Sequence, residues 1–210
     1  MTPSDAREQI VQITQELYAM GLLTATGGNI SARAADGETI WITPTRMFKG
    51  GLAVEDLVRI KPDGTVVEGT RPPSIEFRMH WASYEARPDS TGVVHSHAPI
   101  VTAFAICNQQ FPPINTDAVL LADTPLVPWH LPGSPELAAA VGKALKGCRG
   151  ALLQNHGLIT AGETLRQAAT RAMILEETAK LVLYCKQFRT AVTVIPDDGI
   201  RRLATFKDFV

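Results

Sequence analysis

Apolar residues in the first third of the chain predict one amphipathic helix followed by short strands. Four apolar residues recur at helical spacing between positions 10 and 20, with Ser4 as the expected N-cap and Gly21 as the terminator. Two hairpins are then predicted, because Asp36-Gly37 and Pro62-Asp63-Gly64 are turn sequences between apolar segments. Their strands are residues 30–33 paired with 38–43, and 57–61 paired with 65–68.

Beyond residue 74 the apolar spacing changes, and longer helices alternate with apolar strands. Ser74 and Ser134 are placed to cap two of these helices. The predicted helices are residues 75–86, 99–107, 135–146 and 165–188, and the predicted strands are 92–97 and 150–154. The proline-rich stretch 108–135 is expected to form loops and short strands.

The last predicted helix is the longest. From Leu165 to Val182 its apolar residues recur at three and four positions, as a stripe that faces a core should. Glu176 and Glu177 are expected on its solvated face.

These elements predict an α/β fold with a single domain over residues 1–210. Hairpin turns join neighbouring strands directly, so the central sheet is expected to be mostly antiparallel and covered by helices. No internal repeat or low-complexity linker divides the chain.

The composition argues against several classes of partner. The formal net charge is −1 and the pI is near 6.5, whereas nucleic acids and anionic membranes are bound by clustered positive charge. Cys107, Cys148 and Cys185 are scattered, so we expect reduced, buried thiols of a cytoplasmic protein. The polar N-terminus is unlike a signal peptide, and no uncharged apolar stretch reaches the roughly 20 residues of a membrane span.

Three of the five histidines lie at the ends of predicted strands. His95 and His97 are two residues apart, and side chains alternate between the faces of a strand, so both imidazoles project to the same side. His156 follows the apolar run 150–154. A single histidine would be an ordinary polar residue at a strand end, but this pair with a third candidate ligand favours a divalent metal site.

Other residues offer groups that could bind or convert a substrate. Glu76 lies in the first turn predicted for its helix, where it could ligate a metal, move a proton or stabilise the helix N-terminus. The backbone around Gly28 and Asn29 could approach an anion closely, although a plain tight turn explains the same residues. Thr45 and Arg46 offer a hydroxyl and a guanidinium, unless Arg46 is simply an exposed loop residue.

Five motifs follow one another in a specific order along the chain. They are Thr-Gly-Gly-Asn-Ile-Ser-x-Arg, Ile-Thr-Pro-Thr, Pro-Ser-x-Glu, His-x-His and Gln-Asn-His-Gly-Leu. In this order they resemble the class II aldolase/adducin family, from about Arg7 to Val182. The resemblance implies a sheet with helices on both faces, and a homotetramer with its active sites at subunit interfaces.

The resemblance also implies roles for individual residues. His95, His97 and His156 match the family's metal ligands, with Zn²⁺ the first candidate and Mn²⁺ or Co²⁺ as others. Glu76 matches the acid/base glutamate, which can also ligate the metal. The residues that match the phosphate-binding positions are Gly28, Asn29, Thr45 and Ser74.

The chain departs from the family pattern at three places that bear on its substrate. Arg46 replaces a glycine and Ile75 replaces a second serine, a combination that suits a planar carboxylate at least as well as a phosphate. Thr116 stands where aldolases have a proton-donating tyrosine, and the tail beyond Phe188 carries no tyrosine. Phosphate binding and aldolase-type proton donation are therefore both weakened.

The resemblance then implies a metal-dependent lyase that works through an enolate on a small carboxylate or sugar phosphate. Decarboxylation of a hydroxylated carboxylate is favoured, because departing carbon dioxide needs no proton-donating tyrosine. Retro-aldol cleavage of a ketose phosphate such as L-fuculose 1-phosphate shares the enolate. A sugar-phosphate epimerase and a metal-free, adducin-like scaffold are the other candidates, and the three histidines disfavour the scaffold.

Overall fold

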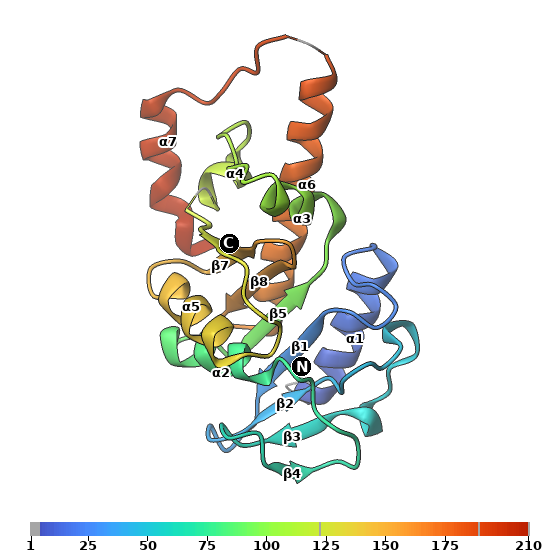
Figure 1. Cartoon of the computed structure of the whole chain (residues 1–210). Helices are drawn as coiled ribbons and strands as arrows, with labels where there is room; N and C mark the ends of the chain where they lie inside the picture. The colour runs from blue at the N-terminus through green and yellow to red at the C-terminus, as the bar shows by residue number, and fades with distance from the viewer. Residues whose placement is uncertain (1–4, 122, 189, 210) are drawn as a thin grey trace.

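Strands from the whole length of the chain form one sheet in the computed structural model, which describes residues 5–121, 123–188 and 190–209 (Figure 1). They are β1 (Asn29–Arg33), β2 (Ile40–Ile42), β3 (Val58–Ile60), β4 (Val66–Glu68), β5 (Gly92–Ser96), β6 (Leu126–Val127), β7 (Gly150–Leu153) and β8 (Gly157–Gly162). Their order in the sheet is β4-β3-β2-β1-β5-β8-β7-β6. Of the neighbouring pairs, β6 and β7 are parallel and the others antiparallel, so the predicted α/β fold is confirmed.

Helices cover both faces of the sheet (Figure 1). They are α1 (Ala6–Ala19), α2 (Phe77–Ala86), α3 (Pro99–Ile106), α4 (Thr116–Leu120), α5 (Pro135–Leu145), α6 (Leu165–Gln187) and α7 (Asp197–Leu203). α1, α3 and α6 share a buried core with Val94 of β5, whereas α2 and α5 share the opposite core with Val93. Adjacent residues of β5 thus face different cores, as strand alternation requires. In the described ranges, no helix has both the length and the apolar character that crossing a membrane demands.

Side-chain caps explain where several helices begin. Ser134 Oγ accepts a hydrogen bond from Leu137 N at 3.1 Å, so the predicted cap of α5 is confirmed. Thr164 and Gln167 form a capping box at the start of α6. Asp5 caps α1, while the predicted cap Ser4 lies outside the described residues.

One strand and two α-helices of the described chain are absent from the sequence prediction. β8 is buried on both faces, so its residues show no alternation of apolar and polar side chains. α4 lies within the stretch predicted to form loops and short strands, and α7 lies beyond the last predicted helix and contacts α4. With five and seven residues, these two helices are too short to establish a periodic pattern.

Two predictions about individual side chains are wrong. Glu176 is only 2% exposed, and its carboxylate accepts hydrogen bonds from the backbone N–H groups of Ile100 and Val101. A buried anion therefore compensates the N-terminus of α3 instead of facing solvent. The cysteines are free, but Cys107 is exposed and the other two are partly buried, because they lie near helix ends and in a loop rather than in the core.

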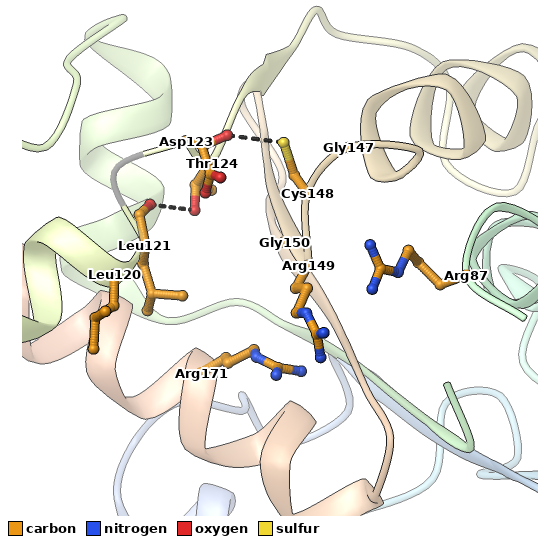
Figure 2. Close-up of a pocket in the computed structure, with 10 residues that line it drawn as sticks. All are labelled: Arg87, Leu120, Leu121, Asp123, Thr124, Gly147, Cys148, Arg149, Gly150 and Arg171. Carbon is orange, nitrogen blue, oxygen red and sulfur yellow. Dashed lines mark hydrogen bonds between the residues drawn. The ribbon is translucent and has the colours of Figure 1, made fainter. Parts of the chain in front are cut away.

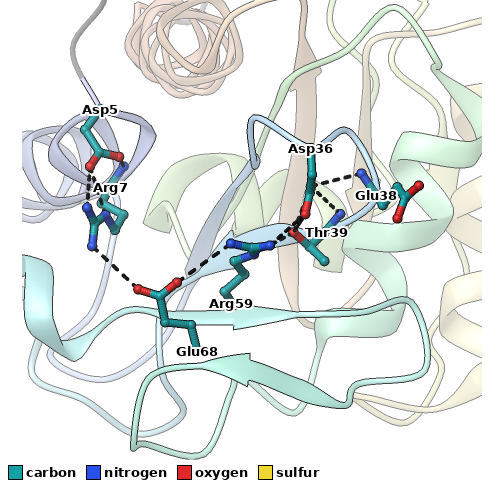
Figure 3. A network of polar contacts seen from close by, with 7 residues as sticks. All are labelled: Asp5, Arg7, Asp36, Glu38, Thr39, Arg59 and Glu68. Carbon is teal, nitrogen blue, oxygen red and sulfur yellow. Dashed lines mark hydrogen bonds and ion pairs between the residues drawn. The ribbon is translucent and has the colours of Figure 1, made fainter.

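A chain of ion pairs crosses the outer end of the sheet (Figure 3). Arg59 of β3 lies 2.8 Å from Asp36 and 3.7 Å from Glu68 of β4, and Glu68 lies 4.0 Å from Arg7 of α1. These side chains are partly exposed and solvent screens their charges, so each pair contributes little to stability. Their charge also protects the exposed edge strand β4 against pairing with another strand.

Candidate metal centre

Three imidazoles meet where β5 ends and β8 begins. The antiparallel register places Ser96 opposite Leu158, so His97 and His156, which flank these strand ends, come together. Asn155 turns the chain between β7 and β8 with a φ of 55°. The ring centroids lie 4.8 Å apart for His95 and His97, 4.7 Å for His95 and His156, and 5.4 Å for His97 and His156.

Hydrogen bonding leaves one nitrogen of His95 available to a cation. Its Nδ1 lies 2.9 Å from the carbonyl oxygen of Leu158, and because a carbonyl only accepts, Nδ1 carries the hydrogen. Burial holds the pKa of His95 well below its ordinary value, so the ring is neutral and Nε2 presents a lone pair. That lone pair faces His97 Nε2 at 3.0 Å. Burial lowers the pKa of His97 as well.

The donor set fits a divalent metal ion. One ligand atom from each imidazole lies within 4.8 Å of the others. Neutral imidazole nitrogens suit Zn²⁺, Co²⁺ and Mn²⁺, and three such ligands leave coordination positions open. Among the described residues, Glu76 Oε1 and His156 Nδ1 are buried without a hydrogen-bond partner. A cation held by this cluster would compensate the buried carboxylate oxygen.

Glu76 faces the imidazoles from the start of α2. Its Oε1 lies 3.2 Å from His156 Nε2, and its Oε2 lies 3.4 Å from His95 Nε2 and accepts a hydrogen bond from Asn29 Nδ2 at 2.8 Å. Burial alone would raise the pKa of Glu76, but the two imidazoles and the Asn29 hydrogen bond together hold it below its ordinary value. The carboxylate is therefore ionised at neutral pH.

The position of Glu76 differs from the sequence prediction. α2 begins at Phe77, so Glu76 is the N-cap residue and not part of the first turn. Ser74 is not the N-cap, although its Oγ accepts a hydrogen bond from Glu76 N at 3.3 Å. The backbone of Glu76, with φ −94° and ψ 12°, is outside the helical region, which lets its side chain leave the helix axis and reach the histidines.

The candidate substrate residues lie together beside this cluster. A cavity of about 140 Å³ is lined by Gly28, Asn29, Thr45, Arg46 and Ser74, together with Glu76 and His97. Gly28 has a φ of +81°, and a Cβ there would lie 3.0 Å from the backbone oxygen of His95, so only glycine allows this close approach. Ile75 also lines the cavity and is mostly exposed.

Lys49 lines the same cavity and is absent from the sequence prediction. It belongs to the short 3-10 turn η1 (Lys49–Gly51) and is 1% exposed. Within the described part of the chain, its amino group makes no hydrogen bond or ion pair. Burial lowers the pKa of Lys49 to about 8, although the charge of Glu76 opposes that shift. No sequence signal marks this lysine as buried, because its burial depends on how the loop docks.

A second cavity, of about 210 Å³, lies at the end of β7 remote from the histidines (Figure 2). Arg171 of α6, Arg87 at the end of α2 and Arg149 just before β7 line this cavity together. Arg87 lies 2.7 Å from Asp89, and Arg149 lies 3.2 Å from Glu163. Carboxylates of the same chain therefore already compensate two of these cations, and this cavity is not the candidate active site.

The sequence matches a protein family over most of its length. A family model described as the class II aldolase and adducin N-terminal domain matches residues 8–183. The chain is 36% identical over 194 residues to L-fuculose phosphate aldolase of Escherichia coli (strain K12), covering 91% of this chain and 89% of that protein. It is 33% identical over 211 residues to 3-oxo-tetronate 4-phosphate decarboxylase of Cupriavidus necator, covering 96% and 95%. The chain belongs to the class II aldolase/adducin family.

Solved structures share the fold. The structure of an L-fuculose 1-phosphate aldolase matches with a TM-score of 0.86 at 28% identity, covering 98% of this chain and 97% of that chain. YgbL from Klebsiella pneumoniae, named as an aldolase, epimerase or decarboxylase, matches with a TM-score of 0.87 at 29% identity, covering 97% and 99%. The whole sheet and its helices are thus those of class II aldolases.

Proposed function

We propose that this chain is a divalent-metal-dependent carbon–carbon lyase that decarboxylates a hydroxylated carboxylate. The observation that carries the proposal is the convergence of three imidazoles and Glu76 beside a cationic cavity. The relatives include a protein named as an aldolase and one named as a decarboxylase, and both names support lyase chemistry for this chain.

The metal would be held by His95, His97 and His156. Zn²⁺ suits three neutral imidazoles best, and Mn²⁺ and Co²⁺ are the other candidates. When bound, the ion supplies positive charge that stabilises an oxygen on which negative charge develops as the carbon–carbon bond breaks. Glu76 either completes the ligand set or stays free to move a proton.

Two cations in the cavity support an anionic substrate. The planar guanidinium of Arg46 can donate two parallel hydrogen bonds to a carboxylate. Lys49 is buried and forms no ion pair in the described part of the chain, so a substrate anion in the cavity would compensate its charge more fully than the charge of Glu76 does. Gly28, Asn29 and Thr45 would bind the remaining polar groups of the substrate.

The proposed reaction breaks the bond between the substrate carboxylate and the adjacent carbon. The electron pair of that bond moves toward a carbonyl on the β carbon, which a hydroxylated 3-oxo acid supplies, to give an enolate, and carbon dioxide leaves. The enolate carbon then takes one proton. Water would supply that proton, and the ionised Glu76 would take it up and pass it to the enolate carbon; the position of its Oε1, 3.2 Å from His156 Nε2, supports this role.

Retro-aldol cleavage of a ketose phosphate is the second candidate. The 36% identity to the Escherichia coli aldolase favours it. That cleavage needs an acid and a base to move protons between the two fragments, whereas departing carbon dioxide needs no acid. In the described part of the chain no tyrosine lines the cavity, and Thr116 lies on α4, outside it. Epimerisation, which the name of YgbL includes, would interconvert isomers without fragmentation.

We further propose a cytoplasmic homotetramer with its active sites at subunit interfaces. Large apolar side chains are exposed in the chain segments that line the cavity, as expected of a surface that a second subunit covers. They include Phe48 and Ile75, each more than half exposed, and Ile75 lines the cavity itself.

The reaction class is tested by incubating protein loaded with Zn²⁺, Mn²⁺ or Co²⁺ with 3-oxo and hydroxy acids, with and without a terminal phosphate, and with ketose phosphates. We expect carbon dioxide release from a carboxylate substrate and no aldehyde release. Glu76→Gln should lower the rate at least about 100-fold, because general acid–base catalysis contributes roughly 10²–10⁴-fold. Activity confined to ketose phosphates would contradict decarboxylation.

A further inference from the structure

An unbroken chain of buried hydrogen bonds runs from Glu76 into the core of the protein. Asn29 Nδ2 donates to Glu76 Oε2 at 2.8 Å, and Asn29 Oδ1 lies 2.5 Å from His80 Nε2. His80 Nδ1 lies 2.7 Å from Ser31 Oγ, which lies 2.9 Å from the hydroxyl of Tyr84. All five residues are less than 9% exposed, so water does not interrupt the chain.

The donors and acceptors of these contacts fix the direction of the hydrogens in this chain. A carboxylate only accepts, so Asn29 must present its amide nitrogen to Glu76 and its oxygen to His80. That oxygen also only accepts, so His80 Nε2 carries a hydrogen. Burial keeps His80 neutral, and its Nδ1 must then accept from Ser31.

We infer that His80 is a positioning residue for Glu76 and acts on it through the amide of Asn29. With Oε2 held by Asn29 beside His95, the other oxygen, Oε1, lies 3.2 Å from His156 Nε2, so the carboxylate stays turned toward the imidazoles. If the amide of Asn29 rotated, two oxygen atoms would face each other at 2.8 Å, and the neutral Nε2–H tautomer of His80 prevents that rotation.

The placement of these residues follows from the fold. Asn29 and Ser31 lie two residues apart on β1, so their side chains share one face, and Asn29 pairs with His95 across the strands. His80 and Tyr84 lie four residues apart on α2, which brings both over that face. Glu76 lies four residues before His80. The N-cap of α2 therefore supplies the glutamate, and one face of the helix supplies its positioning histidine and the tyrosine that ends the chain.

The inference rests on the proposed function in one respect: it takes Glu76 as the carboxylate that binds the metal or moves a proton. Its first test needs neither metal nor substrate. Long-range ¹H–¹⁵N correlation spectra of metal-free, histidine-labelled protein at pH 7 report the tautomer of each neutral imidazole. We expect His80 as the Nε2–H tautomer. Protonation of Nδ1, or of both nitrogens, would overturn the inference.

The second test measures the affinity of the protein for Co²⁺. Residues that orient metal-site groups change affinity about 10–100-fold when removed, so His80→Leu and Asn29→Ala should each weaken Co²⁺ binding at least about 10-fold. The double variant should be no weaker than either single one, because both act through one path. His80→Gln, which keeps a donor toward Asn29, should stay within about threefold of wild type.

Ser83→Ala is the matched control for this test. It removes a buried hydrogen bond on the same helix, from Ser83 Oγ to Met79 O at 2.7 Å, but lies outside the chain. It should lower thermal stability and leave the Co²⁺ affinity unchanged. Wild-type affinity in both His80→Leu and Asn29→Ala, or additive losses in the double variant, would overturn the inference. Failure of the wild type to bind Co²⁺ would sink the proposed function and leave the tautomer test to decide the inference.

Discussion

Single buried charges govern both the stability and the chemistry of this site. Lys49 is buried and forms no ion pair in the described part of the chain, although the charge of Glu76 acts on it, and Glu76 is buried among imidazoles. A buried charge costs folding free energy unless an opposite charge compensates it. A metal cation would compensate the charge of Glu76, and a substrate anion would compensate that of Lys49. Binding these ligands therefore offsets the free energy that the two buried charges cost.

Lys49→Met should therefore stabilise the metal-free, ligand-free protein and weaken anion binding. Replacing the buried ammonium by an apolar side chain of similar size should raise the free energy of unfolding by about 1–3 kcal/mol at pH 7. The affinity for malonate should fall at least about 10-fold. Chemical unfolding and calorimetry check the two effects.

Lys61→Met is the control for that substitution, since Lys61 is exposed. It should change neither quantity by a measurable amount. A Lys49→Met protein that is destabilised and binds malonate as tightly as the wild type would contradict the role given to Lys49.

The residues of the site differ in how far the sequence predicts them. The meeting of His95 and His97 is predictable, because strand alternation is a local property of the backbone. The first residue of α2 is harder to predict: the sequence places Glu76 in the first turn, whereas the structure has it at the N-cap. The burial of Lys49 depends on contacts with distant segments, which no local pattern records.

At the level of elements, the close contact between β5 and β8 sets the geometry of the metal centre. Gly157, the first residue of β8, lies against the backbone carbonyl of Ser96, and a Cβ there would overlap that oxygen. Backbone atoms cannot move aside as a flexible side chain can. The absence of a side chain at Gly157 thus lets His156 approach His95.

Gly157→Ala should therefore destabilise the protein and also weaken metal binding. Overpacking of this kind costs about 1–3 kcal/mol, and separation of the two strands should lower Co²⁺ affinity at least about 10-fold. Gly92→Ala is the matched control, because a Cβ there would overlap Leu165 at the opposite end of β5. It should destabilise the protein comparably and leave Co²⁺ affinity unchanged; equal losses of affinity in both variants would contradict this account.

The same strand pair shows where prediction of the elements fails. The hairpins β1–β2 and β3–β4 are predictable because turn sequences separate their strands. β8 is a central strand buried on both faces, so its sequence shows no alternation. It begins directly after His156, and no glycine-rich motif marks the turn at Asn155. The sequence predicts Glu176 on the solvated face of its helix, because a charged residue is usually exposed. It is buried because α3 packs there and donates backbone hydrogen bonds to its carboxylate.

At the scale of the whole molecule, burying neutral histidines makes the fold sensitive to acid. His80 is fully buried, and burial lowers its pKa to about 4 from an ordinary value of 6.5. The unfolded chain therefore binds a proton at His80 below about pH 6.5, while the folded chain does not until about pH 4. Stability is fully present above pH 6.5 and is lost as the pH falls between these values.

This difference predicts a loss of about 3 kcal/mol of unfolding free energy from His80 between pH 6.5 and pH 4 in the metal-free protein. His80→Gln should show a smaller decrease over the same range, because glutamine does not titrate. Urea unfolding at several pH values checks the prediction. Parallel pH dependences in wild type and variant would contradict it.

The metal content of the protein tests the central claim most directly. Wild-type protein is equilibrated with Zn²⁺, separated from excess metal by gel filtration and analysed by inductively coupled plasma mass spectrometry. A folded double variant, His97→Ala with His156→Ala, is treated in the same way. The account predicts about one zinc ion per wild-type chain and almost none in the variant, since too few ligands remain. A wild-type chain that retains no zinc, or a variant that retains as much, would contradict the account.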